Sequence, residues 1–183
     1  MPEDVTFLPG ERLRELAGEA ASRVLPDELG ETLPVPVSAN GRIVLLVMYY
    51  EETGPPGRRT VRPPSHAMHL DGATGRVLRL WASTPEELGI IDPRADVPGA
   101  GIRDGMPWEE FAAKRDRVLA LGPAVWHGYA TAQTRLDAEA VAGAREYRQL
   151  LMEVTPKAVA PFYVQAAAEF FRWLDAVTGP ERP

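Results

Sequence analysis

The chain has no cysteine, which excludes disulfide bonds, thiol nucleophiles, iron–sulfur clusters and thiolate zinc sites. Histidine is also scarce, with 3 residues in 183. The longest apolar run covers residues 43–50, far short of the ~20 residues that a membrane-spanning helix needs. The first residues lack the basic and apolar segments of a secretory signal. We therefore expect a cytoplasmic protein with no membrane partner.

Positive charge is in deficit, because 26 acidic residues stand against 20 basic ones and the net charge is −6. This balance argues against a general nucleic-acid-binding protein. Only two of the basic residues are lysines, Lys114 and Lys157. Such a preference for arginine is typical of the coding bias of a GC-rich bacterial genome. The acidic excess is concentrated in the first 60 residues, which suggests one acidic face.

The first half of the chain changes from a helical to a strand-like period. Residues 11–25 repeat apolar side chains at helical spacing and are followed by Pro26. Asn40-Gly41 then lies between two strand-like runs, 35–39 and 42–51, which is the strongest short signal for a hairpin. Further strands are expected at 61–70, interrupted by two prolines, and at 76–81.

The second half is expected to be helical. Residues 83–87 have the signature of a helix start, and 91–106 form a long irregular segment. Helices are expected over 107–121, ending at Gly122-Pro123, then over 124–154 as one helix or two, and from 155 to about 177. The prediction is an α+β fold: an N-terminal helix, a four-stranded antiparallel meander, and three or four C-terminal helices packed on the sheet. We expect one domain over 1–183, with a possible division into 1–90 and 107–180.

The element order over residues 11–82 resembles small helix-plus-meander binding modules of the PepSY type. The resemblance rests on this order and on the strand–turn–strand segment from His69 to Leu78, with its Asp71-Gly-Ala-Thr-Gly75 turn. It implies a fold of helix and meander, and we transfer no activity from it.

Histidines and a carboxylate form the densest polar cluster, His66, His69 and Asp71. These residue types bind divalent metals, but on a strand His66 and His69 face opposite sides. A ligand or metal site would need a further donor, and His127 is the remaining histidine. The alternative is a hydrogen-bonded pair of His69 and Asp71 beside a turn, with His127 packed or exposed beside aromatic residues. We favour this alternative and predict neither a bound metal nor a cofactor.

Three acidic residues, Asp92, Asp96 and Asp104, lie in the long segment 91–106. They either meet a basic partner protein or are simply solvated. The last helix is rich in aromatic residues, and Phe171 lies outside its main apolar stripe. Phe171 and Trp173 either contact a partner, including a second copy of the chain, or belong to the core.

Arg115 falls on the apolar face of its helix, with Trp108 and Phe111. We expect its charged end to reach solvent beyond the apolar surface, and the alternative is that it marks a polar pocket.

Two classes of function follow from these patterns. No nucleophile motif, phosphate loop or coherent set of metal ligands is present, which favours a non-enzymatic protein that binds another protein. An immunity-type inhibitor of a basic toxin is one example. The alternative is an enzyme or small-molecule binder with a pocket between sheet and helices, lined by His66, His69, Asp71 and His127.

Overall fold

The computed structural model describes residues 5–26, 29–54, 60–82, 97, 99–100 and 106–179. This part of the chain forms helices and one antiparallel sheet, which confirms the predicted α+β class. In chain order the elements are α1 (Gly10–Ser22), β1 (Leu29–Glu31), β2 (Val35–Ala39), β3 (Arg42–Thr53), β4 (Thr60–Val61), β5 (His66–Leu70), β6 (Val77–Ala82), α2 (Trp108–Ala130), α3 (Ala138–Val154), α4 (Ala160–Ala166) and α5 (Ala168–Thr178). The helix start expected at 83–87 lies outside the described residues.

The six described strands occupy four positions across the sheet, which is why the predicted four-stranded meander is nearly right. The long strand β3 is central: β1 and β2 pair with it along one side, and β5 and β4 pair with it along the other. Strand β6 continues the sheet beyond β5. The predicted strand 61–70 is thus broken into β4 and β5, the predicted run 35–39 is β2, and β1 was not predicted.

Both breaks have a local cause. Between β1 and β2, the hydroxyl oxygen of Thr32 accepts a hydrogen bond from the Met48 N–H at 2.9 Å, so a side chain replaces part of the ladder. Between β4 and β5, Pro63 and Pro64 have no N–H to donate to the ladder. Pairing resumes at Ser65, whose N–H donates to the Tyr49 carbonyl at 2.9 Å.

The predicted hairpin at Asn40-Gly41 is confirmed. Both residues have positive φ angles, 52° and 77°, as a type I′ turn requires. The register pairs Ala39 with Arg42 and Val35 with Leu46. The middle of β3, which lies at the centre of the sheet, is buried.

The helix end predicted at Gly122-Pro123 is wrong, because α2 continues through both residues to Ala130. Pro123 cannot donate to the carbonyl of Leu119 four residues earlier. That carbonyl instead faces the start of α1, where a Cβ built on Gly10 would lie 2.2 Å from the Leu119 oxygen. Gly122 makes room for the ring of Trp126, since a Cβ there would lie 2.6 Å from it. Tertiary packing therefore accommodates Gly122 and Pro123, the two residues from which the helix end was predicted.

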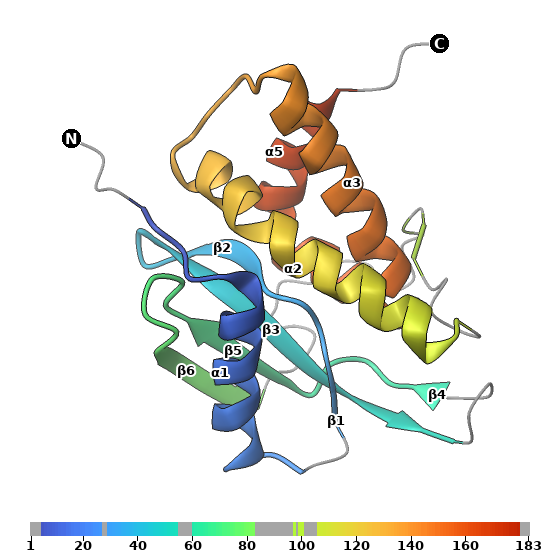
Figure 1. Ribbon diagram of the computed structural model, residues 1–183. Coiled ribbons are helices and arrows are strands. Elements are labelled where there is room, and N and C mark those ends of the chain that lie inside the picture. The colour runs from blue at the N-terminus through green and yellow to red at the C-terminus, as the bar shows by residue number, and fades with distance from the viewer. Residues whose placement is uncertain are drawn as a thin grey trace.

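The helices cover the sheet in two groups (Figure 1). Helix α1 lies across one face of the sheet, and α2, α3 and α5 gather beside β2. Buried hydrogen bonds hold the second group together and connect the helices to the sheet. The Trp126 indole on α2 donates a hydrogen bond to the Tyr147 hydroxyl on α3 at 3.0 Å. The Tyr163 hydroxyl on α4 donates to the Leu33 carbonyl beside the sheet.

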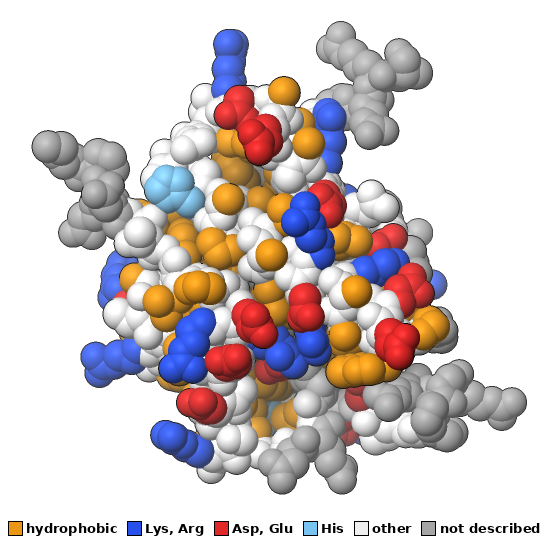
Figure 2. Space-filling view, in the orientation of Figure 1, with side chains coloured by type: hydrophobic (Ala, Val, Ile, Leu, Met, Phe, Trp, Pro, Cys, Tyr) orange, Lys and Arg blue, Asp and Glu red, His pale blue; other side chains and the backbone are white. Residues whose placement is uncertain are grey.

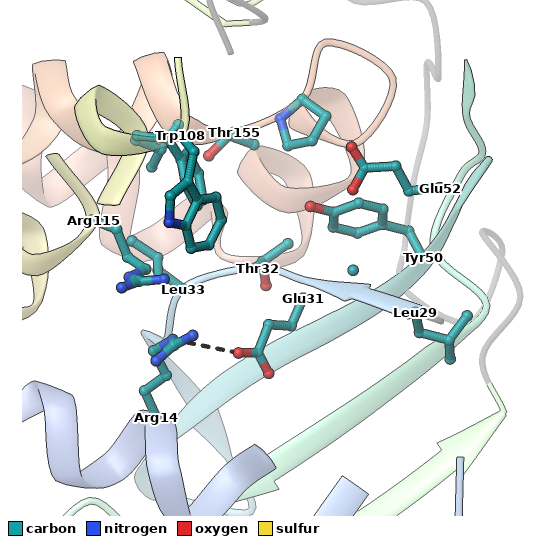
Figure 3. Close-up of a pocket in the computed structure, with 14 residues that line it drawn as sticks. Arg14, Leu29, Glu31, Thr32, Leu33, Tyr50, Glu52, Trp108, Arg115 and Thr155 are labelled. Carbon is teal, nitrogen blue, oxygen red and sulfur yellow. Dashed lines mark ion pairs between the residues drawn. The ribbon is translucent and has the colours of Figure 1, made fainter. Parts of the chain in front are cut away.

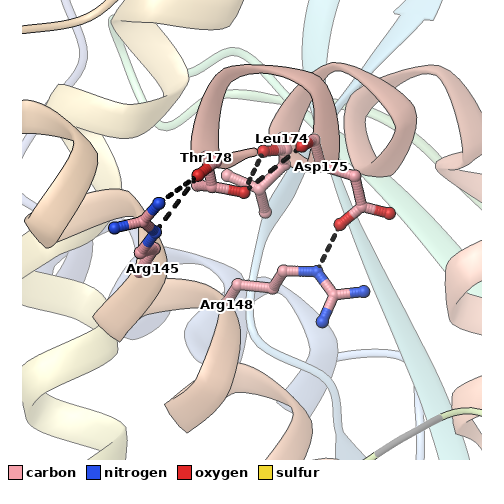
Figure 4. A network of polar contacts seen from close by, with 5 residues as sticks. All are labelled: Arg145, Arg148, Leu174, Asp175 and Thr178. Atoms are coloured by element: carbon pink, nitrogen blue, oxygen red, sulfur yellow. Dashed lines mark hydrogen bonds and ion pairs between the residues drawn. The ribbon is translucent and has the colours of Figure 1, made fainter. Parts of the chain in front are cut away.

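Helix α5 is fastened to α3 by two arginines (Figure 4). Arg145 donates from two guanidinium nitrogens, at 3.1 and 2.6 Å, to the carbonyl of Thr178 in the last turn of α5. Arg148 pairs with the Asp175 carboxylate at 2.6 Å. Cationic groups are favourable at the carboxyl end of a helix, so these contacts orient α5 and supply a hydrogen-bond donor to a carbonyl group of its last turn.

Candidate functional site

The three carboxylates predicted to meet a basic partner, Asp92, Asp96 and Asp104, lie outside the described residues. Acidic and basic side chains are nearly balanced among the described residues, so most of the surplus negative charge belongs to segments outside them.

The histidines and Asp71 each have separate neighbours. His66 contacts the Ser65 hydroxyl through Nδ1 at 2.9 Å, and His69 packs edge-on against Trp81, with ring centroids 4.8 Å apart. Burial and the nearby Arg79 lower the pKa of His69. His127 is exposed on α2 and donates from Nδ1 to the Val5 carbonyl at 2.8 Å.

Asp71 stabilises its turn by accepting from the N–H groups of Ala73 and Thr74 at 2.9 and 3.3 Å, and it lies 3.5 Å from an Arg42 nitrogen. The structure gives no hydrogen bond between Asp71 and His69. Throughout the described residues, no group of three or more His, Asp or Glu side chains is arranged to hold a metal ion.

The two aromatic residues singled out on the last helix differ in exposure. Phe171 is 4% exposed and packs against Tyr163 and Phe170, so its side chain belongs to the core. Trp173 is half-buried, stacks on Phe170, and donates from its indole to the Gln133 carbonyl at 2.7 Å. Trp173 alone of this pair offers substantial surface.

A hollow with a largely polar lining lies where α1, the β1 edge, α2 and the junction of α3 and α4 meet (Figure 3). We call it the Trp108 cavity. It has a volume of about 350 Å³, at the lower end of the range for small-molecule sites. The residues that line it are Arg14, Leu29, Gly30, Glu31, Thr32, Leu33, Tyr50, Glu52, Trp108, Phe111, Arg115, Val154, Thr155 and Pro156.

A partly buried carboxylate, that of Glu31, faces two guanidinium groups in this cavity (Figure 3). The Arg14 Nε atom lies 3.5 Å from a Glu31 oxygen, too far for a good hydrogen bond. Burial raises the pKa of Glu31, and the positive charges of Arg14 and Arg115 oppose that rise. The effect of burial on the pKa of Glu31 is therefore larger than the combined effect of the two arginines. Their positive charges compensate the Glu31 carboxylate only in part.

An arginine and two aromatic rings form the wall contributed by α2. The Arg115 guanidinium carbon lies 5.6 Å from the Trp108 ring centroid and 5.9 Å from that of Phe111, within cation–π range. The Arg115 side chain is 14% exposed, so it faces the cavity instead of reaching freely into solvent. Trp108 is 67% exposed, far more than is usual for tryptophan.

A second, more apolar hollow of about 670 Å³ lies between α2, the segment after it and α3, where Trp173 and His127 contribute to the lining. Gly128 and Gly143 lie in its lining, and a Cβ built on Gly128 would lie 3.2 Å from the Trp173 ring. Figure 2 shows apolar side chains in the recess between these helices, and interleaved acidic and basic side chains over α1 and the adjacent part of α2.

Sequence reasoning found one member of the Trp108 cavity as a site residue, Arg115, whose place on an apolar helix face gave the signal. It missed Arg14 and Glu31, which look like ordinary surface charges in the sequence. It placed Trp108 on the buried face of its helix. The contact between α1, β1 and α2 alone brings these residues together.

Comparison of the chain with models of known protein families, with curated proteins and with solved structures found no match. Among the described helices, none combines the length and apolar character required to cross a bilayer.

Proposed function

We propose that this chain is a non-enzymatic, cytoplasmic protein that binds another, basic protein. The observation that carries the proposal is the exposure of Trp108 at the rim of a cavity, with Arg115 over its ring. Tryptophan and arginine are enriched at the energetic centres of protein interfaces, where a large ring becomes desolvated. The other tryptophans are buried or half-buried, so Trp108 is the one suited to anchor a partner.

Charge supports a basic partner. Asp92, Asp96 and Asp104 precede Trp108 closely in the sequence, and Glu109 and Glu110 follow it in the first turn of α2. Complementary charge around an aromatic anchor accelerates encounter more than it tightens the final complex. An immunity-type inhibitor that occludes a basic toxin is one protein of this class.

The first experiment is affinity capture of the tagged chain from a lysate of its own host, followed by measurement of association and dissociation rates with the purified partner. The Asp92→Asn/Asp96→Asn/Asp104→Asn variant should associate more slowly at low salt, on the order of 10-fold, because it loses steering charge. The matched control, Glu11→Gln/Glu19→Gln/Glu139→Gln, removes three charges from exposed helical positions elsewhere and should leave most of the rate intact.

Substitution of Trp108 tests whether this side chain anchors the partner protein. Trp108→Ala should raise the dissociation rate by about 30-fold, which corresponds to the ~2 kcal/mol that defines an interface hot spot. Val24, 68% exposed beyond the end of α1, is a suitable control, and Val24→Ala should change neither rate. Failure to retain a stoichiometric basic protein, or equal dissociation rates for both variants, contradicts the proposal.

A further inference from the structure

The Trp108 cavity has more cationic than anionic character at the end where α1 meets α2. Two guanidinium groups, from Arg14 and Arg115, lie on the same side of the cavity around one carboxylate, that of Glu31 (Figure 3). The other acidic neighbour of Arg115 is Asp116, which accepts from Nε at 3.2 Å but has a side chain 60% exposed to water. It therefore compensates Arg115 only weakly.

The terminal nitrogens of both guanidinium groups are free to donate. Among the described residues, Arg14 has an ion pair at 3.5 Å and no hydrogen bond, and the hydrogen bond of Arg115 uses Nε alone. Arginine offers a planar fork of donors that matches the two oxygens of a carboxylate. A ligand carboxylate in the cavity would place a second negative charge, beside that of Glu31, next to the two guanidinium groups. It would thereby reduce the repulsion between their positive charges.

The rest of the cavity has aromatic rings on two sides, and the Glu52 side chain lies beside Tyr50 (Figure 3). The exposed ring of Trp108 stands on one side and Tyr50 on the other (Figure 3). A volume of about 350 Å³ admits one aromatic ring with a short side chain.

We propose that the Trp108 cavity binds a small aromatic carboxylic acid, whose carboxylate is held by Arg14 and Arg115 and whose ring lies against Trp108. This site shares Trp108 and Arg115 with the surface proposed for the protein partner. Its ligand needs no second protein, so binding to the purified chain tests it separately.

The probe for this site is phenylacetate, titrated into the ¹⁵N-labelled protein and followed through the indole N–H signals, with that of Trp108 assigned from Trp108→Phe. We expect saturable movement of the Trp108 signal with a Kd of about 1 mM, as is usual for a ligand of this size. Phenylacetamide has nearly the same shape without the charge, and it should bind at least 10-fold more weakly. Equal binding of acid and amide, or no saturable movement of the Trp108 signal, would overturn the proposal.

Arginine variants locate the carboxylate. Arg14→Gln and Arg115→Gln should each weaken phenylacetate binding by about 10-fold or more. The matched controls are Arg12→Gln on α1 and Arg117→Gln on α2; both side chains are half-exposed, pair with other glutamates, and lie outside the lining. Arg117 lines the second hollow, so a loss in Arg117→Gln instead would move the ligand there and refute the assignment.

Weaker binding in the arginine variants could also result from a damaged fold. A variant that is expected to bind more tightly distinguishes the two causes. Glu31→Gln removes the carboxylate that competes for the two guanidinium groups, so phenylacetate should bind several-fold more tightly. A damaged fold cannot produce a gain, and weaker binding in Glu31→Gln would contradict the proposed arrangement.

Discussion

The contact between α1 and α2 places Arg14 and Arg115 on the same side of the Trp108 cavity (Figure 3). Substitutions at two glycines of α1 test this contact and should change stability with opposite signs. At Gly10 a built Cβ would lie 2.2 Å from the Leu119 carbonyl oxygen and 2.9 Å from its Cα atom. These are backbone atoms of another helix, so a rotamer change cannot relieve the clash. At Gly18 a built Cβ meets nothing within 4 Å.

The magnitudes follow from these surroundings. Gly18→Ala should stabilise the protein by about 0.5–1 kcal/mol, because alanine loses less backbone entropy than glycine in a helix. Gly10→Ala should destabilise it by about 1–3 kcal/mol, the usual cost of overpacking, because α1 must move away from α2. The displacement also separates the positive end of α1 from the carbonyl that Pro123 leaves without its helical donor.

Chemical and thermal unfolding measure the difference. For a chain of this length, 1 kcal/mol corresponds to about 2–4 °C in Tm, so the two variants should lie on opposite sides of the wild type by resolvable amounts. If Gly10→Ala were as stable as Gly18→Ala, the close approach of α1 to Leu119 would be refuted, together with the explanation of how α2 passes through Pro123.

Three further predictions concern single groups. Tyr147→Phe should cost about 1–3 kcal/mol in urea unfolding, because it leaves the buried Trp126 N–H without its acceptor and creates almost no cavity. Gly41→Ala should cost about 1–2 kcal/mol in the same assay, since φ is +77° in open space and only backbone strain opposes the new methyl group. Because the pKa of Glu31 is raised above 4.5 in the folded state, ionised Glu31 destabilises the fold above that raised pKa, and the cost is relieved as pH falls toward 4.5. Glu31→Gln should therefore gain stability relative to the wild type on going from pH 4.5 to 7; a constant difference in thermal unfolding across that range would show that its pKa is not raised.

The candidate site shows why sequence patterns identify single residues more easily than groups of residues that meet only in the folded chain. Arg115 attracted attention because a charged residue on an apolar helix face is a local anomaly. Glu31 and Arg14 carry no such signal, since both resemble the charged residues found on any protein surface. Their meaning depends on a long-range contact between helix and sheet edge. The histidine cluster illustrates the reverse, because residues close in sequence acquire separate neighbours when strand alternation and a turn intervene.

The sequence by itself determined the elements whose causes are local. Asn40-Gly41 can adopt the positive φ angles of a tight hairpin, Asp137 caps α3 by accepting from the Ala140 N–H at 2.8 Å, and apolar side chains at helical spacing define α1. Tertiary structure decided the rest. Helix α2 continues through Gly122-Pro123 because a neighbouring helix and a buried ring use the space and the carbonyl that those residues leave. The Trp108 cavity exists because three separate segments meet, and the free energy of such contacts depends on packing partners that a local pattern does not contain.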